Sequence, residues 1–189
     1  MVGKIILASS SPRRADILRK AKIEVEIMPS PYIEDYTTTA FSYEFIENLA
    51  YNKAKALIPK LKEPSLIIGA DTVVIFEDKI LGKPKTREEA FNMLKMLSGN
   101  THHVITGIAV VDTETGLEYT SHDITYVKFS KLSDNKINDY IDNMKPYDKA
   151  GAYGIQELPK DFVEKIDGEI DNVIGLPTKI LIKLLYSIK

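Results

Sequence analysis

The order of strand-like and helix-like patterns constrains the fold of this chain more than any other feature. Ile5 to Ala8 form a continuous apolar run that ends at three serines and Pro12. This predicts a buried strand that leads directly into a helix extending to about Ala21. Apolar residues at helical spacing predict further helices over 42–57 and 133–143. Strands and helices mixed in this order indicate an α/β protein.

Paired strand patterns argue against an all-parallel sheet. A turn at 77–79 separates two strand-like runs, and long strands are predicted over 104–111 and 119–129. Residues 162–174 predict a hairpin that turns at Asp167 and Gly168. The alternation of apolar and acidic residues over 23–27 predicts a strand with one wet face.

Two further helices are marked by their ends. Thr86 and Glu89 have the spacing of a capping box, and Gly99 stands just past the end of that predicted helix. Pro177 precedes a terminal apolar stripe that ends near Ile188. We therefore expect one helix between Thr86 and Gly99 and another after Pro177.

Composition bounds the class of protein. The 189 residues are 44% apolar and 28% charged, with no linker-like stretch, so we expect one compact, bilobed domain over 1–189. A net charge of -2 argues against stable nucleic-acid binding, and the lack of cysteine excludes thiolate chemistry. The first apolar run is shorter than a signal-peptide core or a membrane span, so a cytoplasmic protein without a membrane partner is expected.

The first candidate site lies where the first predicted strand meets its helix. Residues 9–14 read Ser-Ser-Ser-Pro-Arg-Arg, which places hydroxyl groups at a helix amino terminus and two guanidinium groups in its first turn. Backbone N–H groups, the helix dipole and arginines all favour a phosphate there, with Ser9, Ser11 and Arg14 as candidate contacts. The segment is not a Walker loop. The residues alone leave open a capped helix, with Ser11 as N-cap, whose arginines are solvated.

Asp71 is the second candidate, in a Gly-Ala-Asp-Thr segment between two apolar runs. A carboxylate at a strand end or inside a sheet is costly unless it meets a cation, a metal or hydrogen-bond donors. Because Asp is depleted in strands, a functional carboxylate is favoured. The alternative is an aspartate that caps a turn.

Lysines and acidic residues supply further candidates. Lys53 interrupts an apolar helical stripe, so it must snorkel, pair or point into a polar cleft. Lys83, between a glycine and a proline, is weaker evidence. Glu34 and Asp35 form an adjacent acidic pair suited to Mg²⁺, although solvated loop charges explain them equally well.

The segment 148–156 is rich in small residues that would let a ligand approach the backbone. Gln156 at its end could recognise a base edge with one donor and one acceptor. The alternative interpretation of the segment is a plain surface turn. His102 and His103 have no partners at metal-ligand spacing and are interpreted as strand residues.

Taken together, five segments resemble the signature segments of the Maf family, in the same order. They cover nearly the full length: residues 7–14, 69–72, 81–84, 148–156, and Gly168 with 172–177. The resemblance implies a central mixed sheet flanked by helices, with two lobes and a cleft, similar to inosine-triphosphate pyrophosphatases. It also implies metal-dependent hydrolysis between the α and β phosphates of a nucleoside triphosphate. The Lys-Ala-Gly-Ala-Tyr-Gly-Ile-Gln segment accompanies the branch that acts on dTTP and UTP, and the 7-methyl-GTP branch differs there.

The resemblance also assigns roles to matching positions. Asp71 becomes the proton acceptor or metal-linked carboxylate, and three residues set substrate choice: Arg13, Thr72 and Gln156. Lys53 and Lys83 match phosphate-facing lysines. The acidic position after the second strand is often Glu in relatives and falls here on Asp35, with Glu34 just before it, so either could join Asp71 at Mg²⁺ or Mn²⁺. After Gln156 the family often has Gly, whereas this chain has Glu157.

The leading hypothesis is therefore a pyrimidine nucleoside triphosphate pyrophosphatase that serves nucleotide-pool sanitation and forms a homodimer by analogy with the family. The alternative is a nucleotide-binding regulator of cell division without significant turnover. Retention of Asp71 beside cationic residues favours the enzyme.

Overall fold

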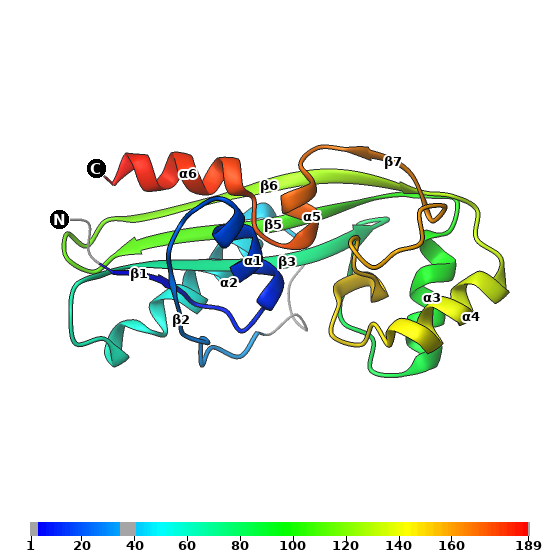
Figure 1. Ribbon diagram of the computed structural model, residues 1–189, viewed down its shortest axis with the longest axis horizontal. Helices are drawn as coiled ribbons and strands as arrows, with labels where there is room; N and C mark the ends of the chain where they lie inside the picture. Colours follow the sequence, from blue (N-terminus) through cyan, green and yellow to red (C-terminus); the bar gives the residue numbers. More distant parts are fainter. Residues whose placement is uncertain (1–3, 35–40, 189) are drawn as a thin grey trace. The chain divides into compact units, whose positions relative to one another are not determined.

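The computed structural model describes residues 4–34 and 41–188, which form two compact units. Unit 1 comprises Met1–Asp71, Thr106–Asp123 and Gly175–Lys189, and unit 2 comprises Thr72–Ile105 and Ile124–Ile174. Three long strands contribute residues to both units: β3 (Ser65–Phe76), β5 (Thr101–Asp112) and β6 (Glu118–Phe129) (Figure 1). The expectation of a single domain stays a prediction.

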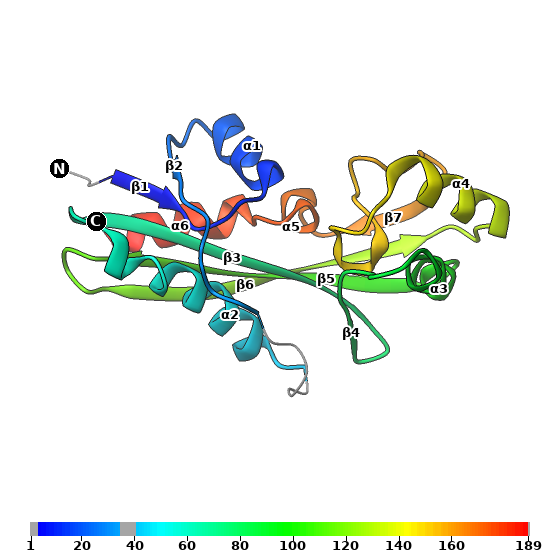
Figure 2. The same cartoon turned by 90° about the horizontal axis from the view of Figure 1, so that it is seen from below.

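Unit 1 has the strand order β2, β1, β3, β5, β6. β1 (Lys4–Leu7) pairs in parallel with β2 (Glu26–Ile27) and with β3. The unit's helices lie on both faces of this sheet, with α1 and α2 on opposite sides in Figure 2. They are α1 (Pro12–Lys20), α2 (Tyr43–Lys55), the 3₁₀ turn η1 (Ile58–Lys60) and α6 (Thr178–Ser187). A core cluster gathers side chains of β1, β3, β5 and α2 and of the residues just after β1 and α2: Ile6, Ala8, Ala54, Leu57, Ile67 and Val111.

Unit 2 continues the long strands and adds two antiparallel neighbours. β4 (Lys79–Leu81) pairs with β3, and β7 (Val163–Asp167) pairs with β6. Its other elements are α3 (Arg87–Leu97), α4 (Asp134–Met144), the 3₁₀ turn η2 (Ala150–Ala152) and α5 (Ile170–Ile174). A separate core packs α3 and α4 against the strands, with Leu94, Phe129, Ile141 and Phe162 among its buried members. The predicted mixed sheet flanked by helices is confirmed.

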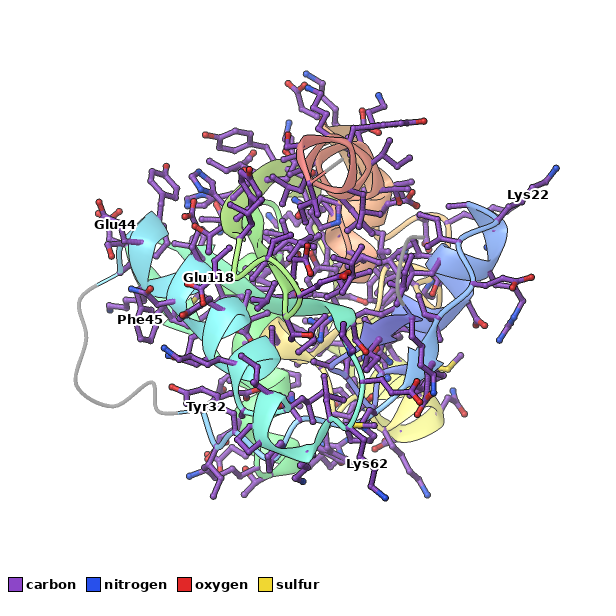
Figure 3. The ribbon with its side chains drawn as sticks, turned by 90° about the vertical axis from the view of Figure 1, so that its left-hand side faces the viewer. Lys22, Tyr32, Glu44, Phe45, Lys62 and Glu118 are labelled. Carbon is purple, nitrogen blue, oxygen red and sulfur yellow. The ribbon has the colours of Figure 1, made fainter. Side chains whose placement is uncertain are left out.

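Two glycines determine how closely α2 approaches the sheet. A Cβ on Gly69 of β3 would lie 2.0 Å from Ala50 O, and one on Gly107 of β5 would lie 2.4 Å from Ile46 O. Both clashes involve the helix backbone, so any larger residue would push α2 away. Tyr51 OH of α2 donates to the carboxylate of Glu118 in β6, at 2.9 Å from each oxygen. Glu118 is labelled beside the cyan helix α2 in Figure 3.

The predicted helix ends are largely confirmed. Thr86 Oγ1 accepts from Glu89 N–H at 3.1 Å, which is one half of the capping box. The other half differs, because Glu89 Oε2 accepts from Lys85 N–H instead. Gly99 follows α3 with a φ of +74°, and Pro177 is the N-cap of α6.

Two predicted strands are wrong in extent. Only residues 26–27 of the range 23–27 pair, because Lys22 adopts a left-handed φ of 58° and Ile23 N–H closes the end of α1 on Leu18 O at 3.0 Å. The hairpin over 162–174 is also wrong in its second half, which is the helix α5.

A buried amide accounts for the helix in place of that second strand. Asn172 in α5 is fully buried, and its Nδ2 donates to Val104 O and Thr125 Oγ1, both at 3.0 Å. Thr125 Oγ1 in turn donates to Glu169 O at 2.9 Å. The return chain is therefore joined to β5 and β6 through side chains rather than through a backbone ladder.

Among the described residues, no helix is long and apolar enough to cross a membrane.

Candidate active site

The loop between β1 and α1 is held together by Arg14. Its Nη1 donates to Ser9 Oγ at 3.0 Å, and its Nε donates to Gly175 O at 2.7 Å. Ser9 is buried at 7% exposure, and its Oγ also accepts from Ser11 N–H at 3.2 Å. Two segments that resemble family signatures are thereby joined within unit 1.

Ser11 occupies the expected N-cap position of α1, but its side chain makes no capping hydrogen bond. Pro12 follows at the first helical position, as predicted. Arg13 is half-buried in the first turn. The start of α1 therefore combines hydroxyl groups, guanidinium groups and helix N–H groups, which is a composition suited to an anion.

Lys53 connects two carboxylates in the interior of unit 1. It lies on the buried face of α2 with 8% of its surface exposed, and its Nζ contacts Asp71 Oδ1 and Glu34 Oε1. Asp71 lies inside β3 and is 3% exposed, so the alternative of a turn-capping aspartate is wrong. The alternative of a snorkelling lysine is also wrong, because the ammonium is paired rather than solvated.

These contacts test whether the residues suit a divalent cation. Oxygens of Glu34 and Asp71 converge on one positive group, and Mg²⁺ is held in proteins by one or two carboxylates together with substrate phosphates and waters. Asp35 lies outside the described residues. Within 4–34 and 41–188 there is no group of three or more acidic, histidine or cysteine residues that could hold a metal. Two carboxylates fit a cation that is shared with a phosphate ligand.

In unit 2, two of the signature segments lie side by side. Gly151 N–H donates to Gly82 O at 3.1 Å, which joins η2 to the loop after β4. Gly151 has a φ of +66°, and a Cβ there would lie 3.0 Å from the side chain of Val74 in β3. Lys83, which follows Gly82, is exposed. Gly151 therefore packs closely against β3, and the predicted approach of a ligand to this segment stays a prediction.

Tyr153 anchors the segment that contains η2. Its hydroxyl group lies 2.7 Å from Nε2 of His102 in β5, and both side chains are buried. Burial lowers the pKa of His102 to about 3 and raises the pKa of Tyr153 above its ordinary value. Among the described residues, His102 Nδ1 has no hydrogen-bond partner. His102 is a strand residue, as predicted, but its contact with Tyr153 could not be predicted from the sequence pattern.

The residues predicted to set substrate choice belong to different units. Arg13 is in unit 1, whereas Thr72 and Gln156 are in unit 2. Thr72 is half-buried within β3, and Gln156 is exposed. The roles of these three residues stay predictions.

Comparison with known proteins gives matches over nearly the whole chain. A family model described as Maf-like protein matches residues 4–188. A dTTP/UTP pyrophosphatase from Clostridium novyi (strain NT) is 47% identical over 184 residues, which cover 96% of this chain and 95% of the relative. One from Alkaliphilus oremlandii (strain OhILAs) is 48% identical over 174 residues, with 92% and 90% covered.

Solved structures give more distant matches. A HAM1 protein from Coxiella burnetii has a TM-score of 0.46 and 19% identity, and it covers 70% of this chain and 75% of that chain. A nucleoside-triphosphatase / dITP/XTP pyrophosphatase from Mycobacterium abscessus has a TM-score of 0.41 and 17% identity, with 68% and 75% covered.

Proposed function

The chain belongs to the Maf family, whose model spans residues 4–188, and on this premise we propose that it is a dTTP/UTP pyrophosphatase. The reaction is hydrolysis of a pyrimidine nucleoside triphosphate to the monophosphate and pyrophosphate. Curated relatives with this name match more than nine-tenths of the chain at 44–48% identity, which supports the substrate class. The structural observation that carries the chemistry is the contact of Lys53 with both Glu34 and Asp71.

Unit 1 supplies groups suited to a triphosphate and a hard cation. Glu34 and Asp71 would hold Mg²⁺ or Mn²⁺, which when bound offsets negative charge on the phosphates. The ammonium of Lys53 lies against both carboxylates and is available to move toward an anionic oxygen. Arg13 and the start of α1 add positive potential for phosphate oxygens. Arg14 acts as a brace, because Ser9 and Gly175 accept hydrogen bonds from two of its nitrogens.

The reaction needs one base and one leaving group. A water molecule attacks the α phosphorus, its proton passes to Asp71 Oδ, and the bond from that phosphorus to the bridging oxygen breaks so that pyrophosphate leaves. Positioning and charge stabilisation provide most of the acceleration of such transfers. Lys53 Nζ contacts Asp71 Oδ1 and so helps to hold this carboxylate in place.

Unit 2 supplies the candidates for base choice. Uracil and thymine present a carbonyl, an N3–H and a second carbonyl, and the Gln156 carboxamide can meet two of these groups with one donor and one acceptor. Cytosine reverses part of this pattern, which leaves polar groups unpaired and separates substrates strongly. Thr72 and Lys83 keep the roles that the family resemblance implies.

A nucleotide panel tests this proposal. Release of monophosphate and pyrophosphate is measured for dTTP, UTP, CTP, GTP and 7-methyl-GTP, with and without Mg²⁺. We expect dTTP and UTP to be hydrolysed well ahead of the others, and only with the cation. Phosphate release in place of pyrophosphate would place the cleavage at another bond.

Asp71→Asn tests the catalytic assignment. The variant keeps the shape and removes the charge, so turnover should fall at least about 100-fold, which corresponds to roughly 3 kcal/mol of barrier. Asp142→Asn is the matched control, because Asp142 pairs with Arg87 on the surface of unit 2. Near-wild-type turnover of Asp71→Asn at saturating Mg²⁺ would remove Asp71 from the mechanism.

The same panel separates the enzyme from a regulator of cell division that binds nucleotide without turnover. Calorimetric binding of dTTP with no product formed would favour the regulator. A cytoplasmic location and a homodimer stay predictions from sequence and from family resemblance.

A further inference from the structure

Lys149 forms ion pairs with carboxylates at both ends of the segment 148–157, and the family resemblance assigns no role to these pairs. Lys149 Nζ lies 2.7 Å from Asp148 Oδ1 and 3.1 Å from Glu157 Oε2. Only 9% of the Lys149 side chain is exposed, although it belongs to a loop. A buried ammonium is costly unless it is paired, and here the two carboxylates come from opposite ends of one segment.

The stem of Lys149 packs against Gly154. A Cβ on Gly154 would lie 2.8 Å from Lys149 Cε and 3.4 Å from Glu157 Cδ, so a larger residue there would displace the end of the lysine side chain. Glu157 N–H donates to Gly154 O at 2.9 Å, which turns the chain and brings Glu157 to the ammonium. The backbone turn and the ion pair therefore support each other.

Gln156 immediately precedes Glu157 in this closed segment. Its side chain is exposed. A group that distinguishes bases by donor and acceptor pattern has to be held in place before the base arrives, because ordering it on binding costs affinity. The neighbouring ion pair supplies a way to hold the backbone.

We propose that Lys149 is a positioning residue for base recognition: it holds Glu157 and thereby fixes the backbone from which Gln156 reads the pyrimidine. This inference rests on the proposed function, because it takes Gln156 as the base reader. A rival role for Lys149 is direct contact with a phosphate. The rival predicts an equal loss for every triphosphate, whereas positioning predicts a loss confined to the bases that Gln156 favours.

The test compares kcat/KM for dTTP and CTP in Lys149→Met, Glu157→Gln and the double variant. We expect the dTTP to CTP ratio to fall about tenfold in each single variant, with the loss on the dTTP side. The dTTP to CTP ratio in the double variant should fall no further than in the single variants, because both changes remove the same contact. Lys149→Arg should restore most of the ratio. Lys165→Met is the matched control, since it removes the exposed pair of Lys165 with Asp167.

Two kinetic results would overturn the proposal. One is an unchanged ratio in Lys149→Met. The other is an equal loss for dTTP and CTP in Lys149→Met with wild-type kinetics in Glu157→Gln, which would make Lys149 a phosphate ligand.

Amide hydrogen exchange in the nucleotide-free protein separates this proposal from the proposed function. Exchange over 150–156 should be faster in Lys149→Met and Glu157→Gln than in the wild type, and unchanged in Lys165→Met. Unchanged exchange in all variants would overturn the positioning role even in an active enzyme. A wild type that does not hydrolyse dTTP or UTP would instead overturn the proposed function.

Discussion

Gly107→Ala is expected to lower turnover, although Gly107 lies in no segment that resembles a family signature. Gly107 faces α2 so closely that an added Cβ would lie 2.4 Å from Ile46 O and 2.7 Å from Ile46 C. Both are backbone atoms, so rotation of a side chain cannot relieve the clash. To reach an ordinary contact of about 3.4 Å, the helix has to move by about 1 Å.

That movement reaches the candidate active site because α2 also carries Lys53, two turns beyond Ile46. A shift of α2 changes the position of Lys53 relative to Asp71 in β3. A misplacement of about 1 Å can cost about 100-fold in rate. Overpacking of a core costs about 1–3 kcal/mol. We therefore expect kcat for dTTP to fall by about one to two orders of magnitude and the free energy of unfolding to fall by about 2 kcal/mol.

The assays are kcat at saturating dTTP and Mg²⁺, and urea unfolding. Gly69→Ala should have a larger effect on kcat and stability than Gly107→Ala, since its Cβ would lie 2.0 Å from Ala50 O. Gly82→Ala is the control for stability, because an added Cβ there meets nothing within 4 Å. If Gly107→Ala is destabilised but keeps the wild-type kcat, the reasoning is refuted. That result would mean that the distance between α2 and the sheet does not set the position of Lys53.

Three further outcomes are expected. Lys53→Met should lower the free energy of unfolding by roughly 3 kcal/mol in EDTA, because Glu34 and Asp71 then face each other without a cation; a loss that Mg²⁺ does not reduce would contradict a shared cation site. The pKa of His102 is about 3 in the folded protein, against 6.5 ordinarily, so the unfolded state binds more protons between these values and stability falls as the pH is lowered. The wild type should lose about 2 kcal/mol more than His102→Gln between about pH 6.5 and about pH 4.5, and equal losses in the two proteins would exclude a buried neutral imidazole. Gln156→Ala should narrow the gap in kcat/KM between dTTP and CTP by slowing hydrolysis of dTTP. A wild type that prefers GTP to both dTTP and UTP would exclude assignment to the dTTP/UTP branch.

Local patterns in the sequence predicted α1, α2, α3, α4 and α6 and the strands β5 and β6, because their signals are local. Thr86 at an N-cap and the apolar stripe of α2 each depend on residues within a few turns. The second strand over 162–174 was predicted wrongly because alternation alone does not reveal that Asn172 would be buried against Thr125 of β6. Such contacts between distant segments override local preference.

The candidate site was predictable where one residue contradicted its surroundings. Lys53 in an apolar stripe and Asp71 between apolar runs are each costly alone, which indicated a partner but not which one. The structure pairs them with each other and with Glu34. Lys149 gave no such signal, because a lysine in a polar loop is ordinary until its burial and its pairing with Glu157 are seen.

The hydrogen bond from Arg14 Nε to Gly175 O has a consequence for the order in which the protein is made, because its partners lie 161 residues apart. At about 5–20 residues per second, a ribosome adds Gly175 roughly 8–32 s after Arg14. Throughout that interval the chain of unit 2 can be completed, whereas the loop that contains Ser9 lacks its carboxyl-terminal brace. A nascent chain therefore lacks this connection between the first loop of unit 1 and its carboxyl-terminal segment until Gly175 has been added.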